Sequence, residues 1–126
     1  MAFSNALSYK VIGCALEVYK RLGPGLLESI YEKALMKELE YQGIHAENQV
    51  PVQVMYRDEN LGDGMRLDIL VEKSLIIELK SVEEVSKVHY KQLQTYLKLT
   101  GLRYGLLINF NVDDLMEGIH RVVNGY

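Results

Sequence analysis

Cysteine and long apolar runs are scarce in this sequence, and each shortage excludes a class of protein. The single cysteine, Cys14, cannot form a disulfide within the chain, and its apolar neighbours favour a buried structural thiol. No run of about 18 apolar residues occurs, and the N-terminus lacks the apolar stretch of a signal peptide. We therefore expect a cytoplasmic protein with no membrane among its partners.

Positive charge is also in short supply. The chain carries 14 Lys and Arg against 17 Asp and Glu, which gives a formal net charge of −3. A protein that coats nucleic acid through a broad basic surface would need the opposite balance. Any phosphate binding must therefore be local, and a bound divalent cation could supply the positive charge there.

The motifs of several common chemistries are missing as well. The three histidines, His45, His89 and His120, are scattered and do not show the spacing of zinc ligands. The chain has neither a phosphate-binding glycine loop nor a Gly-x-Ser-x-Gly nucleophile motif. Zinc-site and serine-hydrolase chemistry are therefore not indicated.

What is present is the composition of one globular domain, which we expect to span residues 1–126. Hydrophobic residues make up 48% of the chain and charged residues 25%, as in ordinary globular proteins. The apolar periodicity predicts helices at 3–22, 26–41 and 84–100, strands at 48–56, 65–71, 75–81 and 104–110, a turn at 57–64, and a short helix or strand within 113–123. The first three strands predict an antiparallel meander. The last strand, an unbroken apolar run reached through a helix, is typical of a buried parallel strand.

Residues 66–80 hold the most informative pattern, because charged groups there lie inside two apolar runs. Glu78 falls in the predicted strand at 75–81, where a carboxylate costs several kcal/mol unless a cation, a metal or hydrogen bonds compensate it. Lys80 lies two residues further on the same strand and so shares its face. One interpretation is an ion pair between Glu78 and Lys80 with Asp68 exposed, and the other is a site formed by all three.

The length of the connection at 72–74 decides whether Asp68 and Glu78 lie on the same face of the sheet. A three-residue connection pairs Val71 with Leu75 and therefore places Asp68 opposite Glu78. A connection one residue shorter would put the two carboxylates on opposite faces. We expect the longer connection and a pair of facing carboxylates.

Several short motifs occur in an order that resembles a known protein family. They are Gly25-Leu-Leu-Glu28-Ser-Ile-Tyr31, Ala34-Leu35 with Glu38-Leu39, Gln49-Val-Pro-Val, Arg66-Leu-Asp68, Ile77-Glu78-Leu79-Lys80, His89 with Gln92 and Tyr96-Leu97, and Gly105-Leu-Leu-Ile-Asn-Phe110. The ordered set covers nearly the whole chain and resembles the GxxExxY protein family, a branch of the PD-(D/E)XK nuclease superfamily. The resemblance implies an α/β, restriction-endonuclease-like fold, in which α-helices flank a small mixed sheet of an antiparallel meander plus one parallel strand.

The same resemblance implies roles for five catalytic residues. Asp68 matches the metal-binding aspartate, Glu78 the second acid and Lys80 the lysine of the superfamily motif. Gln92 matches a helix glutamine, and Glu28 matches the acid of the first motif. Leu67 stands where the superfamily name has a proline, which changes none of these assignments.

A divalent metal, Mg²⁺ or Mn²⁺, is the implied cofactor. Asp68, Glu78 and the backbone carbonyl of Leu79 offer the oxygen ligands that such ions prefer, and Glu28 would add a contact through water. Lys80 would orient the attacking water or stabilise charge on the phosphate.

Four further residues are weaker candidates for substrate contact: Arg66, Tyr31, His89 and Tyr96. Arg66 shares a strand face with Asp68 and could contact a phosphate, although an ordinary surface salt bridge explains it better. Tyr31 would either pack in the core or hydrogen-bond Glu28. His89 and Tyr96 lie on one helical face, which would look at the carboxylates or form an ordinary helix edge.

Two functions follow from these expectations. The first is hydrolysis of phosphodiester bonds in nucleic acid, either DNA or RNA, by a divalent-metal-dependent nuclease. The second is a catalytically silent module that keeps the fold and binds nucleic acid or a protein. A chain this short would also use a homodimer or a protein partner to gain specificity.

Overall fold

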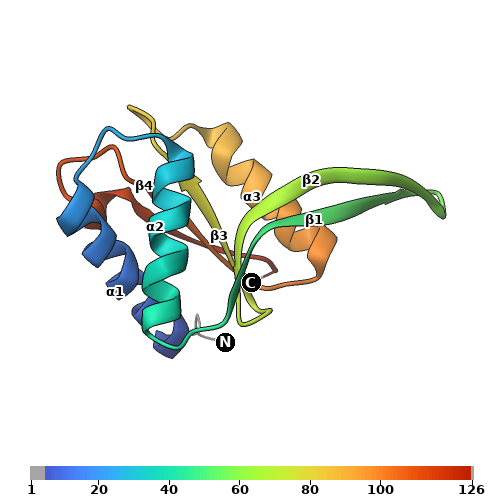
Figure 1. Cartoon of the computed structure of the whole chain (residues 1–126). Helices are drawn as coiled ribbons and strands as arrows, with labels where there is room; N and C mark the ends of the chain where they lie inside the picture. The colour runs from blue at the N-terminus through green and yellow to red at the C-terminus, as the bar shows by residue number, and fades with distance from the viewer. Residues whose placement is uncertain (1–4, 126) are drawn as a thin grey trace.

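The computed structural model describes residues 5–125 as one five-stranded sheet with helices on both faces (Figure 1). Its elements are α1 (Asn5–Leu22), α2 (Glu28–Tyr41), β1 (Ala46–Tyr56), β2 (Glu59–Val71), β3 (Leu75–Lys80), α3 (Lys87–Thr100), β4 (Tyr104–Asn109), the 3₁₀ helix η1 (Leu115–Gly118) and β5 (Ile119–Val123). Positions 3 and 4 of the predicted first helix lie outside the described residues.

The sheet is mixed, as the sequence predicts. Its strands lie in the order β1-β2-β3-β4-β5, and only β3 and β4 run parallel. Helix α3 makes the crossover between these two strands, which a parallel pair requires. All residues of β3 from Leu75 to Leu79 are buried, because helices cover both faces of the sheet centre. The expected fold class is confirmed.

Two hydrophobic cores lie on opposite sides of the sheet. Helices α1 and α2 cover one side, where the ring of Tyr31 stacks on Phe110 with centroids 4.2 Å apart. Helix α3 covers the other side through Leu93, Tyr96 and Leu97. The helix approaches β4 closely at Gly105, where an added Cβ would lie 3.0 Å from the Leu93 side chain.

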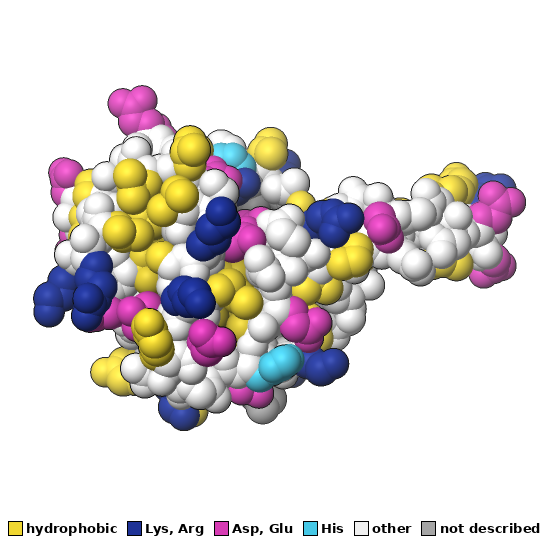
Figure 2. All heavy atoms as spheres, in the orientation of Figure 1, with side chains coloured by type: hydrophobic (Ala, Val, Ile, Leu, Met, Phe, Trp, Pro, Cys, Tyr) yellow, Lys and Arg dark blue, Asp and Glu magenta, His cyan; other side chains and the backbone are white. Residues whose placement is uncertain are grey.

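The hairpin of β1 and β2 departs most from expectation. The predicted turn at 57–64 is wrong. Only Arg57 and Asp58, both with positive φ, turn the chain, and β2 already begins at Glu59. The far ends of β1 and β2 therefore form a two-stranded ribbon that stands away from the body (Figures 1 and 2). We call residues 53–63 the arm.

Other differences are at element boundaries. Helix α3 begins at Lys87, three residues later than predicted, and α2 begins at Glu28, two residues later. The segment within 113–123 contains both a short helix and a strand, η1 and β5.

Candidate active site

The candidate site forms where β2 and β3 separate. Their connection at 72–74 has three residues and pairs Val71 with Leu75, as predicted. The paired ladder continues to Ile69 opposite Ile77 and stops there. Beyond that pair, β2 diverges from β3 and leads into the arm. The next opposed positions are Asp68 and Glu78.

Side chains replace the missing backbone pairing at this point. The backbone amide of Leu79 donates a hydrogen bond of 2.8 Å to Oδ2 of Asp68. The backbone amide of Asp68 donates one of 3.3 Å to Oε1 of Glu78. Each carboxylate is thus held by the opposite strand, and the facing pair expected from the register is present.

Burial makes this pair electrostatically costly. Glu78 is only 5% exposed, and its pKa is raised to about 8, first by burial and then by the negative charge of Asp68. The pKa of Asp68 is raised as well, mainly by burial. Near neutral pH the pair therefore holds a proton unless a cation neutralises it, and a bound cation could take the place of that proton.

Lys80 contributes positive charge without a direct ion pair. Its ammonium lowers the pKa values of both Asp68 and Glu78, yet within residues 5–125 no ion pair joins it to either acid. The predicted alternative of a Glu78–Lys80 ion pair is therefore wrong. The buried amide of Asn109 fixes the chain just past Lys80, donating to the carbonyl of Val82 at 2.9 Å and accepting from its amide at 3.1 Å.

Glu28 lies at the end of β3. Its carboxylate accepts a hydrogen bond of 3.2 Å from the backbone amide of Ser81, whose hydroxyl donates to the carbonyl of Leu26 at 2.6 Å. These contacts tie the start of α2 to the residue that follows Lys80. Glu28 itself is exposed, and in the described part of the chain the partner of its carboxylate is this amide rather than Asp68 or Glu78.

Glu32 is the helix acid that acts on Asp68, and sequence reasoning missed it. It is half-buried, accepts hydrogen bonds from the side-chain amides of Gln49 at 2.7 Å and Asn48 at 3.0 Å, and its charge raises the pKa of Asp68. The available signal was its spacing, because a residue four positions after Glu28 shares its helical face.

Helix α3 approaches the acids from the other side of the sheet. Tyr96 is 6% exposed, and burial followed by the charges of Glu78 and Asp68 raises its pKa. The side-chain amide of Gln92 lies beside the Tyr96 hydroxyl and lowers its pKa. The structure thus brings Tyr96 within electrostatic reach of the carboxylate pair, with the exposed Gln92 beside it.

A family comparison agrees with this geometry. The family model described as the PD-(D/E)XK nuclease superfamily matches residues 5–122, and its acids and lysine are the residue types found at the separation of β2 and β3. The chain belongs to the PD-(D/E)XK nuclease superfamily. Nucleases of this superfamily typically use divalent metals.

A solved structure supports the fold of this superfamily member. The structure titled "Crystal structure of SSO0001" aligns with a TM-score of 0.59 and 23% sequence identity over 78% of this chain. The alignment covers 50% of that chain, so the superfamily member described here spans about half of its length. No protein with a curated description matches. Within residues 5–125, no helix has the length and apolar character that a membrane span requires.

The donor set fits the divalent metal that the superfamily implies. No three side chains of His, Cys, Asp or Glu converge as metal ligands in the described part of the chain. Asp68 and Glu78 are the two that meet, and the carbonyl of Leu79 adds a third oxygen, because the N–H and C=O of one strand residue point the same way and this amide faces Asp68. Hard oxygen donors without nitrogen or sulfur suit Mg²⁺ and Mn²⁺.

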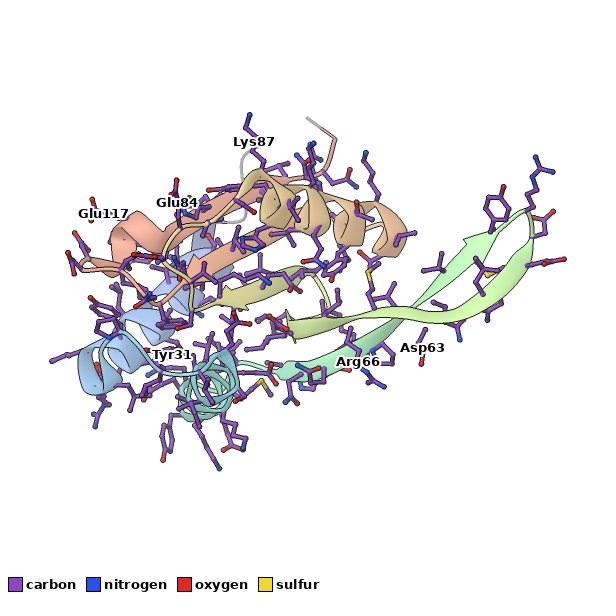
Figure 3. The ribbon with its side chains drawn as sticks, turned by 90° about the horizontal axis from the view of Figure 1, so that it is seen from above. Tyr31, Asp63, Arg66, Glu84, Lys87 and Glu117 are labelled. Atoms are coloured by element: carbon purple, nitrogen blue, oxygen red, sulfur yellow. The ribbon has the colours of Figure 1, made fainter. Side chains whose placement is uncertain are left out.

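Three of the weaker candidates have other partners in this superfamily member. Tyr31 has no exposed surface and bonds the Gly23 carbonyl and the Leu26 amide, so the expectation that it contacts substrate is wrong. Nδ1 of His89 accepts from the Ser86 amide at 3.2 Å, at the start of α3. Arg66 is exposed at the base of the arm, where Nη1 donates to the carbonyl of Gln49 at 3.3 Å (Figure 3).

Proposed function

We propose that this chain is a divalent-metal-dependent nuclease that hydrolyses phosphodiester bonds in nucleic acid. The observation that carries the proposal is the carboxylate pair of Asp68 and Glu78. A buried acid facing a half-buried one, both with raised pKa values and without an ion pair to the nearby lysine, is unfavourable for folding alone. The presence of these two acids is explained if they bind a cation that in turn contacts a phosphate.

In this proposal, Asp68, Glu78 and the carbonyl of Leu79 hold Mg²⁺ or Mn²⁺. The bound ion would polarise the phosphate and lower the pKa of a water molecule. Lys80, which is near both acids and free of an ion pair with either, orients that water or neutralises charge that develops on the phosphate.

The remaining residues support the substrate side of the site. Gln92 and Tyr96 approach from α3 and offer amide and hydroxyl groups for a water or a phosphate oxygen. Arg66 offers a guanidinium at the base of the arm. Membership of the GxxExxY branch and an intracellular location belong to the same proposal, on the ordered motifs and the buried free thiol of Cys14.

A specific observation favours a second function, a silent binding module. The two carboxylates already accept backbone hydrogen bonds, so they close the gap between β2 and β3 without any metal. A net charge of −3 also provides no broad attraction for nucleic acid. Such a module would bind nucleic acid or a protein but leave it intact.

One experiment separates the two functions. The purified protein is incubated with single-stranded, duplex and flapped DNA and with RNA, in Mg²⁺ or Mn²⁺, beside Asp68→Ala and Lys80→Ala. Asp63→Ala and Lys87→Ala are matched controls, because both residues are exposed, Asp63 in the arm and Lys87 at the start of α3 (Figure 3). A nuclease loses cleavage in the first two variants and keeps it in the controls. Cleavage that persists in all four variants is contamination, and binding without cleavage supports the silent module.

A further inference from the structure

The arm exposes apolar side chains on a ribbon that nothing covers within residues 5–125. Met55, Tyr56 and Leu61 are 57%, 61% and 62% exposed. Figures 1 and 2 show the arm projecting from the body with no helix against either of its faces. A two-stranded ribbon alone is marginally stable in water, and exposed apolar residues on it mark a contact surface.

The two faces of the arm differ. Tyr56 pairs directly with Glu59, and Leu61 lies two residues along the same strand, so these three side chains share one face. Met55 pairs with Asn60 on the other face. Tyr56 and Leu61 therefore form the larger apolar surface of the arm.

The arm is also acidic at its end. It carries one positive residue, Arg57, against three negative ones, Asp58, Glu59 and Asp63, for a net charge of −2. This charge opposes contact with phosphates and favours a partner with exposed lysines around an apolar surface.

A groove that combines exposed lysines with an apolar lining lies on the same chain. It has a volume of about 630 Å³ and runs between the second half of α2 and the start of β1. Met36, Ile44 and Ala46 supply its apolar lining, and Lys33 and Lys37 stand along it. Figure 2 shows dark-blue side chains beside yellow ones over this part of α2.

The lysines of the groove are available to a partner. No ion pair holds Lys33 within the described residues, and Lys37 lies 3.9 Å from Glu40 in a pair in which both side chains are more than 70% exposed. An exposed pair of this kind contributes little and exchanges readily for other acids. The groove thus offers apolar depth with positive charge, which complements the arm.

The arm and the groove lie at opposite ends of β1. The groove includes Ala46, the first residue of the strand, and Tyr56 is the last. A two-fold axis that passes beside the middle of β1, which is the edge strand of the sheet, sets the start of this strand in one copy next to its end in the other. Both arms then reach both grooves at once, which closes the assembly as an isologous dimer.

We propose that two copies of this chain form a symmetric dimer in which each arm inserts Tyr56 and Leu61 into the α2–β1 groove of the other copy. The acidic residues Asp58 and Glu59 face Lys33 and Lys37 across the interface. The contact is made by side chains, because Pro51 lacks an amide donor in the edge strand β1 and interrupts backbone pairing there. This inference is independent of catalysis.

Charge reversal tests the proposed surfaces. Analytical ultracentrifugation over a concentration series compares the wild-type protein, Lys33→Glu with Lys37→Glu, and that variant combined with Asp58→Lys and Glu59→Lys. The dimer dissociation constant is expected to rise roughly tenfold or more in the double variant and to return toward the wild-type value in the quadruple variant. Lys87→Glu with Lys91→Glu on the exposed side of α3 is the matched control, with thermal unfolding as a check on folding.

Crosslinking provides a second test that requires a particular geometry. Tyr56→Cys and Lys37→Cys are prepared as separate proteins and mixed, so that a crosslink can form only between copies. A thiol-reactive crosslinker is expected to join these two variants and not to join Tyr56→Cys to Lys87→Cys. A wild-type protein that is monomeric at every concentration, a dimer indifferent to groove reversal, a quadruple variant that does not recover, or equal crosslinking to both cysteine positions would each overturn the proposal.

Discussion

The carboxylate of Glu78 accepts a hydrogen bond from the backbone amide of Asp68 at 3.3 Å, and the carboxylate of Asp68 accepts one from the residue that follows Glu78. The two acids therefore take over the pairing of β2 and β3 where the backbones part. One pair of residues closes the sheet and also concentrates negative charge. This double role leads to the first two predictions.

Stability is expected to fall as the pH rises through the neutral range. The pKa of Glu78 is about 8 in the folded protein against an ordinary 4.5, so between these values the folded state holds a proton that the unfolded chain releases. The free energy of unfolding then decreases with rising pH, by about 1.4 kcal/mol per pH unit at most. Thermal unfolding in chelator-containing buffers from pH 5 to 9 measures how steeply the free energy of unfolding changes with pH. Glu78→Gln should flatten this dependence, and an unchanged slope in that variant would contradict the cause.

A divalent cation is expected to stabilise the protein at pH 8. Metal that binds only the folded state at about 100 times its dissociation constant raises the free energy of unfolding by about 2.7 kcal/mol. Thermal unfolding with and without Mn²⁺ measures the effect. Asp68→Asn should remove it, whereas Asp63→Asn, an exposed acid on the same strand, should retain it. Equal stabilisation of both variants would place the metal elsewhere.

Glu32 is expected to matter more for metal binding than Glu28. Glu32 acts on Asp68 and is held by Gln49 and Asn48, whereas Glu28 bonds the amide of Ser81. Removal of a supporting group beside a metal ligand typically costs about 10–100-fold in affinity. Calorimetric titration with Mn²⁺ should show a loss of roughly tenfold in Glu32→Gln and a smaller change in Glu28→Gln. A larger loss of affinity in Glu28→Gln than in Glu32→Gln would instead make Glu28 the helix acid that supports metal binding.

Tyr31→Phe is expected to reduce stability without altering chemistry. The hydroxyl of Tyr31 donates to the carbonyl of Gly23 and accepts from the amide of Leu26, and its loss leaves both groups short of a partner. The cost should be about 1–2 kcal/mol by urea unfolding. Tyr41→Phe, at a residue that is 77% exposed, should change stability by less than about 0.5 kcal/mol. If Tyr31→Phe instead lowers the cleavage or nucleic-acid binding of fully folded protein, Tyr31 has a substrate role after all.

The sequence predicted the site better than the arm, for a physical reason. The connection at 72–74 fixes register because strands β2 and β3 have buried faces, so a slip of one residue would expose the apolar side chains. The segment 57–64 has no such constraint. Its polar residues and two glycines read as a turn because no core imposes alternation on a ribbon that stands in solvent.

Glu32 was missed for a different reason. Its role depends on Gln49, whose φ of 51° lies in the left-handed region and whose side-chain amide reaches α2. No local pattern in the sequence indicates that backbone conformation. The helix spacing placed Glu28 and Glu32 on one face, but only the structure shows which of them acts on Asp68.

The turns at the two ends of β2 control different features of the structure. This difference determines where residues can be inserted or deleted. The turn at 72–74 alone determines that Asp68 meets Glu78, whereas the turn at Arg57 and Asp58 determines only how far the arm reaches. Removing one residue from each side of the arm preserves the pairing below it, and removing two from each side also preserves which face is apolar. Insertions and deletions in matched numbers are therefore tolerated in the arm and not at 72–74, where a single deleted residue would turn one acid away from the other.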